Sequence, residues 1–213
     1  MDKNKYEALR LRMERTAEAL NKNGFAATCV DNKEEAIDLV EEMLTDGATV
    51  SVGGSMTLFE LGIPELLSSG RFNYLDRYAP GLTTEGRREV FLKSFDSDFY
   101  FCSTNAVTES GELYNVDGNG NRVAAMLYGP QNVVVIAGWN KIVKDIPAAE
   151  ERVREHAAPA NCIRLGRNTP CTKTGRCMDC RSDERICADR VIMSKQVVKG
   201  RVKVILVAEE LGY

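Results

Sequence analysis

Four cysteines lie close together in one polar segment near the C-terminus, with the spacing C-x5-C-x2-C-x6-C. They are Cys171, Cys177, Cys180 and Cys187. Thiolates are soft ligands, and four of them in one loop can surround a metal centre. The loop offers few large apolar residues that would otherwise hold it together. The spacing therefore predicts a metal-binding segment.

Zinc, an iron–sulfur cluster and unligated cysteines compete as interpretations of this segment. Structural zinc commonly uses two C-x2-C pairs, and only Cys177–Cys180 forms one here. An iron–sulfur cluster is larger than one ion and accepts cysteines from a winding loop. Between residues 164 and 190, seven Lys or Arg outnumber four Asp or Glu, which would offset thiolate charge for either metal. We favour a [4Fe–4S] cluster, with zinc as the alternative and disulfides or free thiols as the third.

Composition indicates a cytoplasmic protein. The chain has 213 residues, 44% of them hydrophobic, and a net charge of -3, which points neither to nucleic acid nor to an anionic membrane. No apolar run approaches the roughly 20 residues that span a bilayer, and the charged N-terminus lacks a secretory signal. Cytosolic thiols are mostly reduced, which favours metal over disulfides. Cys29 and Cys102 lie in apolar segments and are expected in the core, whereas Cys162 is either a core or a spare thiol.

The elements that must position such sites alternate between helix and strand. Apolar periodicity predicts helices over residues 4–23, 33–46, 83–96 and 148–157, with further helices starting near 56 and 122. Compact apolar runs predict strands over 26–30, 48–52, 98–104, 132–138 and 201–210. A hairpin is expected at 107–121, between the third and fourth of these strands. This alternation predicts one α/β domain, residues 1–213, with a mostly parallel sheet flanked by helices. The polar region 164–195 is expected to be a cysteine-rich insertion before the last strand.

A glycine-rich turn joins the expected strand 48–52 to the following helix. Gly53, Gly54 and Ser55 would let a ligand approach the backbone, Ser55 can cap the helix, and Thr57 adds a hydroxyl. An anion-binding loop and an ordinary tight turn both fit this pattern.

A second polar segment follows the strand at 98–104. Asn105, Glu109, Asp117 and Arg122 are expected to converge at the carboxyl edge of the sheet, where α/β folds bind ligands. Glu109 could act as base or nucleophile, and Arg122 could clamp a carboxylate or phosphate. Ordinary hairpin turn chemistry explains the same composition equally well.

Three segments together resemble the LUD (lactate utilisation) domain family: SVGGSMTLFELGI, STNAVTESGELYNVDGNGNRVAAMLYGPQNVVVIAGWNKIV and VILVAEELGY. The resemblance extends from about residue 5 to residue 213. It implies a fold similar to that of sugar-phosphate isomerases and CoA transferases (NagB/RpiA/CoA-transferase-like). Some family members belong to an iron–sulfur system that oxidises L-lactate to pyruvate.

The resemblance marks Gly53, Gly54, Ser55 and Thr57 as a ligand loop. It marks Asn105, Asp117 and Arg122 as the pocket, with Glu109 as the catalytic candidate. The predicted function is therefore a redox component of organic-acid utilisation, whose four-cysteine cluster transfers electrons. Expected partners are a small organic acid or a phosphorylated or CoA-type ligand, and iron–sulfur or flavin redox subunits. The alternatives are a non-redox isomerase or transferase with a structural zinc loop, and a metabolite-binding module.

Overall fold

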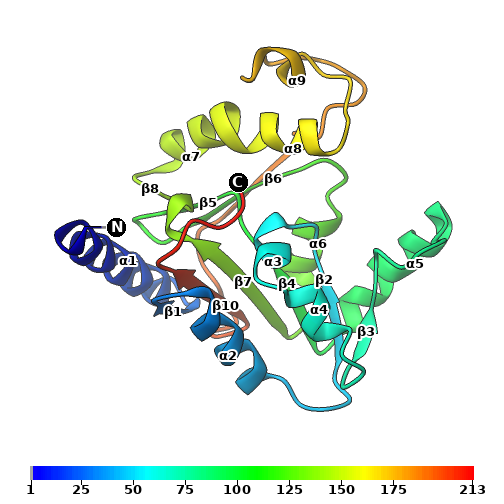
Figure 1. Cartoon of the computed structure of the whole chain (residues 1–213), viewed down its shortest axis with the longest axis horizontal. Helices are drawn as coiled ribbons and strands as arrows, with labels where there is room; N and C mark the ends of the chain where they lie inside the picture. Colours follow the sequence, from blue (N-terminus) through cyan, green and yellow to red (C-terminus); the bar gives the residue numbers. More distant parts are fainter. Residues whose placement is uncertain (1) are drawn as a thin grey trace.

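A six-stranded parallel sheet forms the centre of the molecule, in a computed structural model that describes residues 2–213 (Figure 1). The strand order is β1 (Ala26–Val30), β10 (Val202–Val207), β7 (Asn132–Gly138), β4 (Phe99–Cys102), β2 (Thr49–Val52) and β3 (Asn73–Leu75). Every neighbouring pair runs parallel. The predicted α/β class with a mostly parallel sheet is confirmed.

Helices cover both faces of this sheet, and β7 shows how the two cores divide. Alternate β7 side chains point to opposite faces: Val133 and Val135 belong to one apolar cluster, and Val134 and Ile136 to the other. The first cluster is covered by α1 (Lys3–Lys22) and α6 (Asn121–Tyr128). The second is covered by α2 (Lys33–Met43), α3 (Met56–Glu60) and α4 (Ile63–Leu67). A strand buried on both faces must be apolar at every position, which explains why NVVVIAG is so clear a strand in the sequence.

A second, four-stranded sheet packs beside the first, and the sequence patterns did not predict it. Its order is β8 (Ile142–Val143), β5 (Ala106–Thr108), β6 (Leu113–Asp117) and β9 (Asp189–Met193). The expected hairpin is its antiparallel β5–β6 pair. Strand β9 lies inside the region that was predicted as a cysteine-rich insertion and pairs with β6. Most of β9 is exposed or half-buried, so backbone pairing with β6 defines it rather than an apolar pattern of its own.

The helix predicted over 148–157 is longer than expected. It starts as α7 (Ile146–Arg152), passes through a π-helical turn (Val153–Ala157) and continues as α8 (Ala158–Arg164). Pro159 has no N–H to donate to the carbonyl of Glu155, which gives a local reason for the altered hydrogen-bond register. The helix predicted over 83–96 is α5 (Thr84–Lys93) followed by a 3-10 turn, η1 (Ser94–Asp96). A second 3-10 turn, η2 (Trp139–Lys141), follows β7.

The segment between α8 and β9 contains all four clustered cysteines. Its only helix within the described residues is α9 (Cys171–Thr174). A few hydrogen bonds tie the segment to the rest of the fold, including Cys177 N to Arg154 O at 3.0 Å and Ala188 N to Asp117 O at 2.9 Å. In residues 2–213, no helix is both long and apolar enough to cross a membrane.

Candidate functional site

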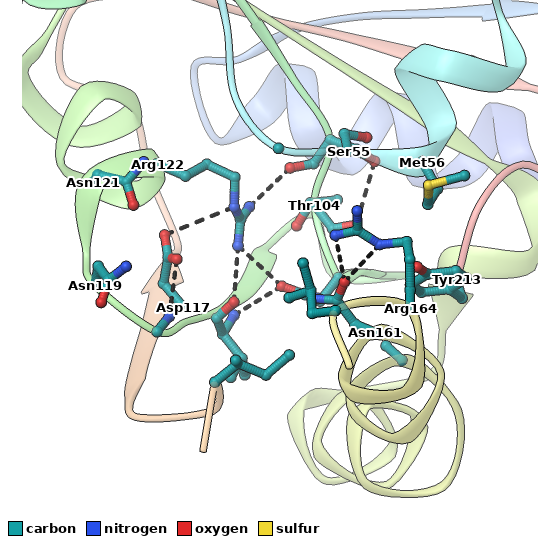
Figure 2. Close-up of a pocket in the computed structure, with 18 of the residues that line it drawn as sticks. Ser55, Met56, Thr104, Asp117, Asn119, Asn121, Arg122, Asn161, Arg164 and Tyr213 are labelled. Atoms are coloured by element: carbon teal, nitrogen blue, oxygen red, sulfur yellow. Dashed lines mark hydrogen bonds and ion pairs between the residues drawn. The ribbon is translucent and has the colours of Figure 1, made fainter. Parts of the chain in front are cut away.

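A cavity of about 350 Å³ opens where the main sheet, the second sheet and α8 meet (Figure 2). Its lining comes from the ends of β2, β4 and β6, from α5 and α8, and from the C-terminal residue. The polar lining residues are Ser55, Arg77, Arg87, Ser103, Thr104, Asn105, Asp117, Asn119, Asn121, Arg122, Lys141, Asn161, Arg164, Arg167 and Tyr213. Because β2 and β4 are parallel, the residues that follow them lie at the same edge of the sheet, where α/β folds bind ligands.

The predicted glycine-rich loop contributes part of this wall. Gly54 and Ser55 line the cavity, and the Ser55 hydroxyl caps α3 by accepting from Leu58 N at 3.4 Å. Gly53 lies beneath the wall: a Cβ there would come within 2.8 Å of the Tyr100 hydroxyl and 3.1 Å of Arg122 Cγ. Close packing around the neighbouring side chains therefore requires glycine at this position.

Arg122 lines the cavity, but its guanidinium is already engaged by protein acceptors. One terminal nitrogen donates to Ser103 O at 2.9 Å and Asn115 Oδ1 at 2.6 Å. The other donates to Asn105 Oδ1 at 3.1 Å and to the carbonyl of Val116 at 3.0 Å. These four bonds use the four N–H groups of the two terminal nitrogens. Arg122 therefore joins β4, β6 and α6 into a rigid wall rather than presenting free donors to a ligand.

Asn105 and Asp117 belong to the same network. Asn105 Oδ1 also accepts from Val116 N at 2.8 Å. Asp117 accepts from Gly118 N at 2.9 Å and from Val123 N at 3.1 Å, which places its carboxylate at the start of α6. Its Oδ2 lies 3.8 Å from Arg122 Nε. The structure thus brings the predicted pocket residues together, and their side chains shape the cavity by binding one another.

Lys141 is buried, with 2% of its surface exposed, yet it lines the cavity. Its Nζ donates to Thr57 Oγ1 at 2.8 Å and to Ser103 Oγ at 3.0 Å. Burial, together with the positive charges of Arg152 and Arg122, lowers the pKa of Lys141 to about 7. Thr57, predicted as a ligand-loop residue, therefore lies below the cavity as a partner of this amine.

Other arginines supply the unneutralised charge of the cavity. Arg77, Arg87, Arg164 and Arg167 all line it, and within residues 2–213 none of the four forms a salt bridge. Arg77 lies over the ring of Phe91, with 4.6 Å between its guanidinium carbon and the ring centroid. Asp117 is the only carboxylate side chain among the residues that line the cavity. The cavity therefore favours an anion.

Arg164 is the arginine that Figure 2 shows reaching from α8 towards Ser55 and Thr104. Its Nε and one terminal nitrogen both donate to Asn161 Oδ1, at 3.1 and 2.7 Å. This contact orients the guanidinium and leaves its remaining N–H groups available.

Glu109 lies outside the cavity. It follows β5, and its Oε1 accepts from Arg12 Nε of α1 at 2.8 Å, in an ion pair with both side chains about one-third exposed. The structure gives this carboxylate a contact with α1 and no place in the cavity wall. A catalytic role for Glu109 stays a prediction.

The four clustered cysteines lie around a second, very small cavity, and Cys162 of α8 joins them there. Burial raises the pKa of the Cys162 thiol to about 11, and Cys171 Sγ lies 3.2 Å from the Thr169 hydroxyl. Asp179 N lies 3.4 Å from Cys177 Sγ, in the geometry of an N–H donor to sulfur. Among residues 2–213, no three His, Cys, Asp or Glu side chains lie close enough together to hold one metal ion.

Arg185 of the same loop places a donor next to one of these sulfur atoms. Arg185 donates to Cys180 O at 2.7 Å, to Cys187 O at 3.0 Å and to Cys187 Sγ at 3.6 Å. Five thiols with N–H and guanidinium donors are a donor set that suits a thiolate-bound metal or cluster. The thiols would have to move closer together to ligate it.

The cysteine segment and the anion cavity share a wall. Within α8, Asn161 and Arg164 line the arginine-rich cavity, whereas Ala158 and Cys162 line the cysteine cavity. Ile186 lines the first cavity, and Cys187, the next residue, lines the second. Helix α8 therefore lies between the two sites, and the adjacent residues Ile186 and Cys187 line one site each.

The sequence patterns singled out Arg122 but neither Lys141 nor the other four cavity arginines as ligand-binding residues, and they left the role of Cys162 open. Lys141 is the third residue after the strand NVVVIAG, so its position near a strand end was a usable signal. Arg164 and Cys162 carried no such signal, because the helix predicted over 148–157 stops before the residues of α8.

Comparison with known proteins identifies the family. The family model described as the LUD domain matches residues 13–207. A solved DUF162 family protein from Deinococcus radiodurans has a TM-score of 0.54 and 15% identity, with 94% of this chain and 98% of that chain covered. That similarity shows a shared fold. Among curated proteins, none is similar enough in sequence to match. The match over most of the length, on a parallel α/β fold, shows that the chain belongs to the LUD-domain family.

Proposed function

We propose that the protein binds a small organic anion, of the lactate or 2-oxo-acid type, in the arginine-rich cavity and takes part in its utilisation. The observation that carries this proposal is the charge of the lining: five arginines against the single carboxylate of Asp117. A volume of about 350 Å³ lies at the lower end of the range for small-molecule sites. It favours a small acid over a whole CoA ester.

Arg164 is the best candidate to bind the carboxylate group directly. A guanidinium can offer two parallel N–H donors to a carboxylate, and Arg164 keeps free donors after binding Asn161. The other unpaired arginines would raise the local concentration of anions in the cavity. Arg122 contributes indirectly, because its bonds hold the wall in place.

For the second site, we propose that Cys171, Cys177, Cys180 and Cys187 hold a [4Fe–4S] cluster that acts in electron transfer. The thiols that share one cavity, the donors to their sulfur atoms and the shared wall with the anion site support this assignment. A cluster bound there would supply one-electron transfer next to the organic acid. Iron–sulfur or flavin partner subunits would exchange those electrons. The competing proposal is a structural zinc in a non-redox isomerase or transferase.

Metal analysis distinguishes the two proposals for the cysteines. The protein is purified anaerobically, its visible absorption is recorded, and iron, acid-labile sulfide and zinc are measured. We expect iron and sulfide together, and their loss in Cys177→Ser. Cys29→Ser is the matched control, because Cys29 lies in β1 of the main sheet. Zinc without sulfide would exclude the electron-transfer proposal.

Calorimetric titration with L-lactate and with pyruvate tests the anion site. Removing a charged hydrogen-bond donor costs about 1.5–3 kcal/mol, so Arg164→Gln should weaken binding about tenfold or more. Arg71→Gln is the control, because Arg71 is half-exposed and paired with Asp46 away from the cavity. If neither acid binds, or if Arg164→Gln binds as well as wild type, this assignment of the cavity is wrong.

A further inference from the structure

Lys141 combines burial with access to the cavity. A buried ammonium is costly, and proteins retain one mainly where its amine has a role. The side chain is 2% exposed, and the groups with the largest effects on its charge are Arg152 of α7, Arg122 of α6, Glu60 of α3 and the Cys102 thiol of β4. Two of these four groups are cations, and they oppose a further positive charge.

The hydrogen bonds around Lys141 determine where a neutral amine would direct its lone pair. The Thr57 hydroxyl donates to Leu211 O at 3.3 Å, and the Ser103 hydroxyl donates to Thr104 O at 3.4 Å. Both hydroxyl oxygens are therefore acceptors towards Lys141 Nζ. A neutral amine has two N–H groups, which these oxygens occupy. Its lone pair then lies on the side away from both of them, and Lys141 is one of the residues that line the cavity.

We propose that Lys141 is a catalytic nucleophile whose amine condenses with the carbonyl group of a 2-oxo acid held in the cavity. This inference rests on the proposed anion binding and names the substrate class more closely. The nitrogen attacks the carbonyl carbon to form a C–N bond as the C=O π bond breaks, and the oxygen takes up a proton that the nitrogen releases, which gives a neutral carbinolamine. Loss of the nitrogen proton and of this hydroxyl group releases water and leaves a Schiff base. The step needs no oxidant or reductant.

The surroundings match the requirements of this reaction. The arginines supply charge to hold the carboxylate next to the carbonyl, and Ser103 and Thr57 hold the amine in place. With a pKa of about 7, caused mainly by burial, much of the amine is neutral at physiological pH. An ordinary lysine, with a pKa near 10.4, is only about 0.1% neutral at pH 7.4. The protonated Schiff base would also acidify the C–H bonds beside it, so the methyl protons of pyruvate should exchange with solvent.

Reductive trapping tests the proposal. The purified protein is incubated with pyruvate and cyanoborohydride, and modified peptides are mapped by mass spectrometry. We expect an added mass equal to pyruvic acid less one oxygen atom, located on Lys141, together with loss of tryptic cleavage after this residue. Lys144 is the internal control, because it is exposed and lies three residues away. Labelling at Lys141 should exceed that at Lys144 at least about tenfold, given the difference in neutral amine between a pKa near 7 and an ordinary one.

A second readout uses exchange of the pyruvate methyl protons in D2O, followed by NMR. Lys141→Arg should abolish catalysed exchange, whereas Lys144→Arg should leave it unchanged. If pyruvate and lactate both bind but Lys141 is not labelled in the wild-type protein, the nucleophile assignment is overturned and the anion site stands. If neither acid binds, both proposals fail. Labelling that is equal at the two lysines also overturns the assignment, and this outcome does not depend on whether a variant folds.

Discussion

Replacing Lys141 with Met gives the sharpest physical test, because the structure predicts how the effect changes with pH. Burial lowers the pKa of Lys141 from its usual 10.5 to about 7. Each pH unit of difference corresponds to about 1.4 kcal/mol, so the protonated ammonium costs the folded state about 5 kcal/mol. This cost is fully present below pH 7, where both states are protonated. It disappears as the pH rises towards 10.5, since the folded state has already lost the proton that the unfolded state still holds.

The wild-type protein should therefore gain stability relative to Lys141→Met by about 2 kcal/mol between pH 7 and pH 9. At pH 6 the variant should be the more stable protein, by about 3 kcal/mol after allowing about 1 kcal/mol for each of the two lost hydrogen bonds. These two hydrogen bonds are the ones that Lys141 Nζ donates to Thr57 and Ser103. Met is the suitable replacement because it is apolar and unbranched, and it fills a similar space.

Urea unfolding at pH 6, 7, 8 and 9 measures these differences. The single tryptophan, Trp139, begins the 3-10 turn that ends at Lys141 and provides the fluorescence signal. Other titrating groups are common to both proteins and largely cancel in the comparison. Lys144→Met is the control and should follow wild type at every pH. A difference between wild type and Lys141→Met that stays constant from pH 6 to pH 9 would refute the lowered pKa and weaken the nucleophile proposal.

Three further substitutions or modifications test the packing around the site. Arg122→Met should lower the free energy of unfolding by about 3 kcal/mol, measured in urea, because it removes the cation that pairs with Asp117 and the donors to several buried acceptors. An unchanged midpoint would contradict the structural role. Gly53→Ala should also destabilise the protein, by about 1–3 kcal/mol, because the added Cβ would lie 2.8 Å from the Tyr100 hydroxyl. A variant as thermally stable as wild type would disprove this tight contact. Burial raises the pKa of Cys102 to about 12, so iodoacetamide at pH 8 should modify this thiol only after the protein unfolds. Mass spectrometry can measure this modification, and rapid labelling of Cys102 in the native protein would contradict the prediction.

The local elements were largely predictable because their signals are local. A strand that is buried on both faces needs apolar residues throughout, so β7 and β10 were evident from NVVVIAG and VKVILV. The short strands β8 and β9 were not predictable in this way. They are defined by pairing with β5 and β6, because β8 has only two residues and most of β9 is exposed or half-buried.

The residues of the candidate site were also predictable only in part. The sequence alone identified the cysteine spacing, the glycine-rich turn and the polar residues after β4, because residue type and position at a strand end suffice for that. It also suggested Arg122 as a ligand clamp. Only the tertiary structure shows that four protein acceptors occupy this arginine and that Glu109 pairs with Arg12 instead of lining the cavity.

The fold class, the family resemblance and the presence of a cysteine-rich segment could be read from the amino-acid sequence alone. Which charged groups lie next to one another became evident only in the folded chain. Lys141 becomes a candidate nucleophile only because the folded chain buries it beside Arg152 and Arg122. Arg164 becomes a candidate carboxylate ligand only because α8 extends past the predicted helix end and crosses the cavity. Burial and electrostatic environment depend on residues far apart in the chain, and a linear pattern does not contain them.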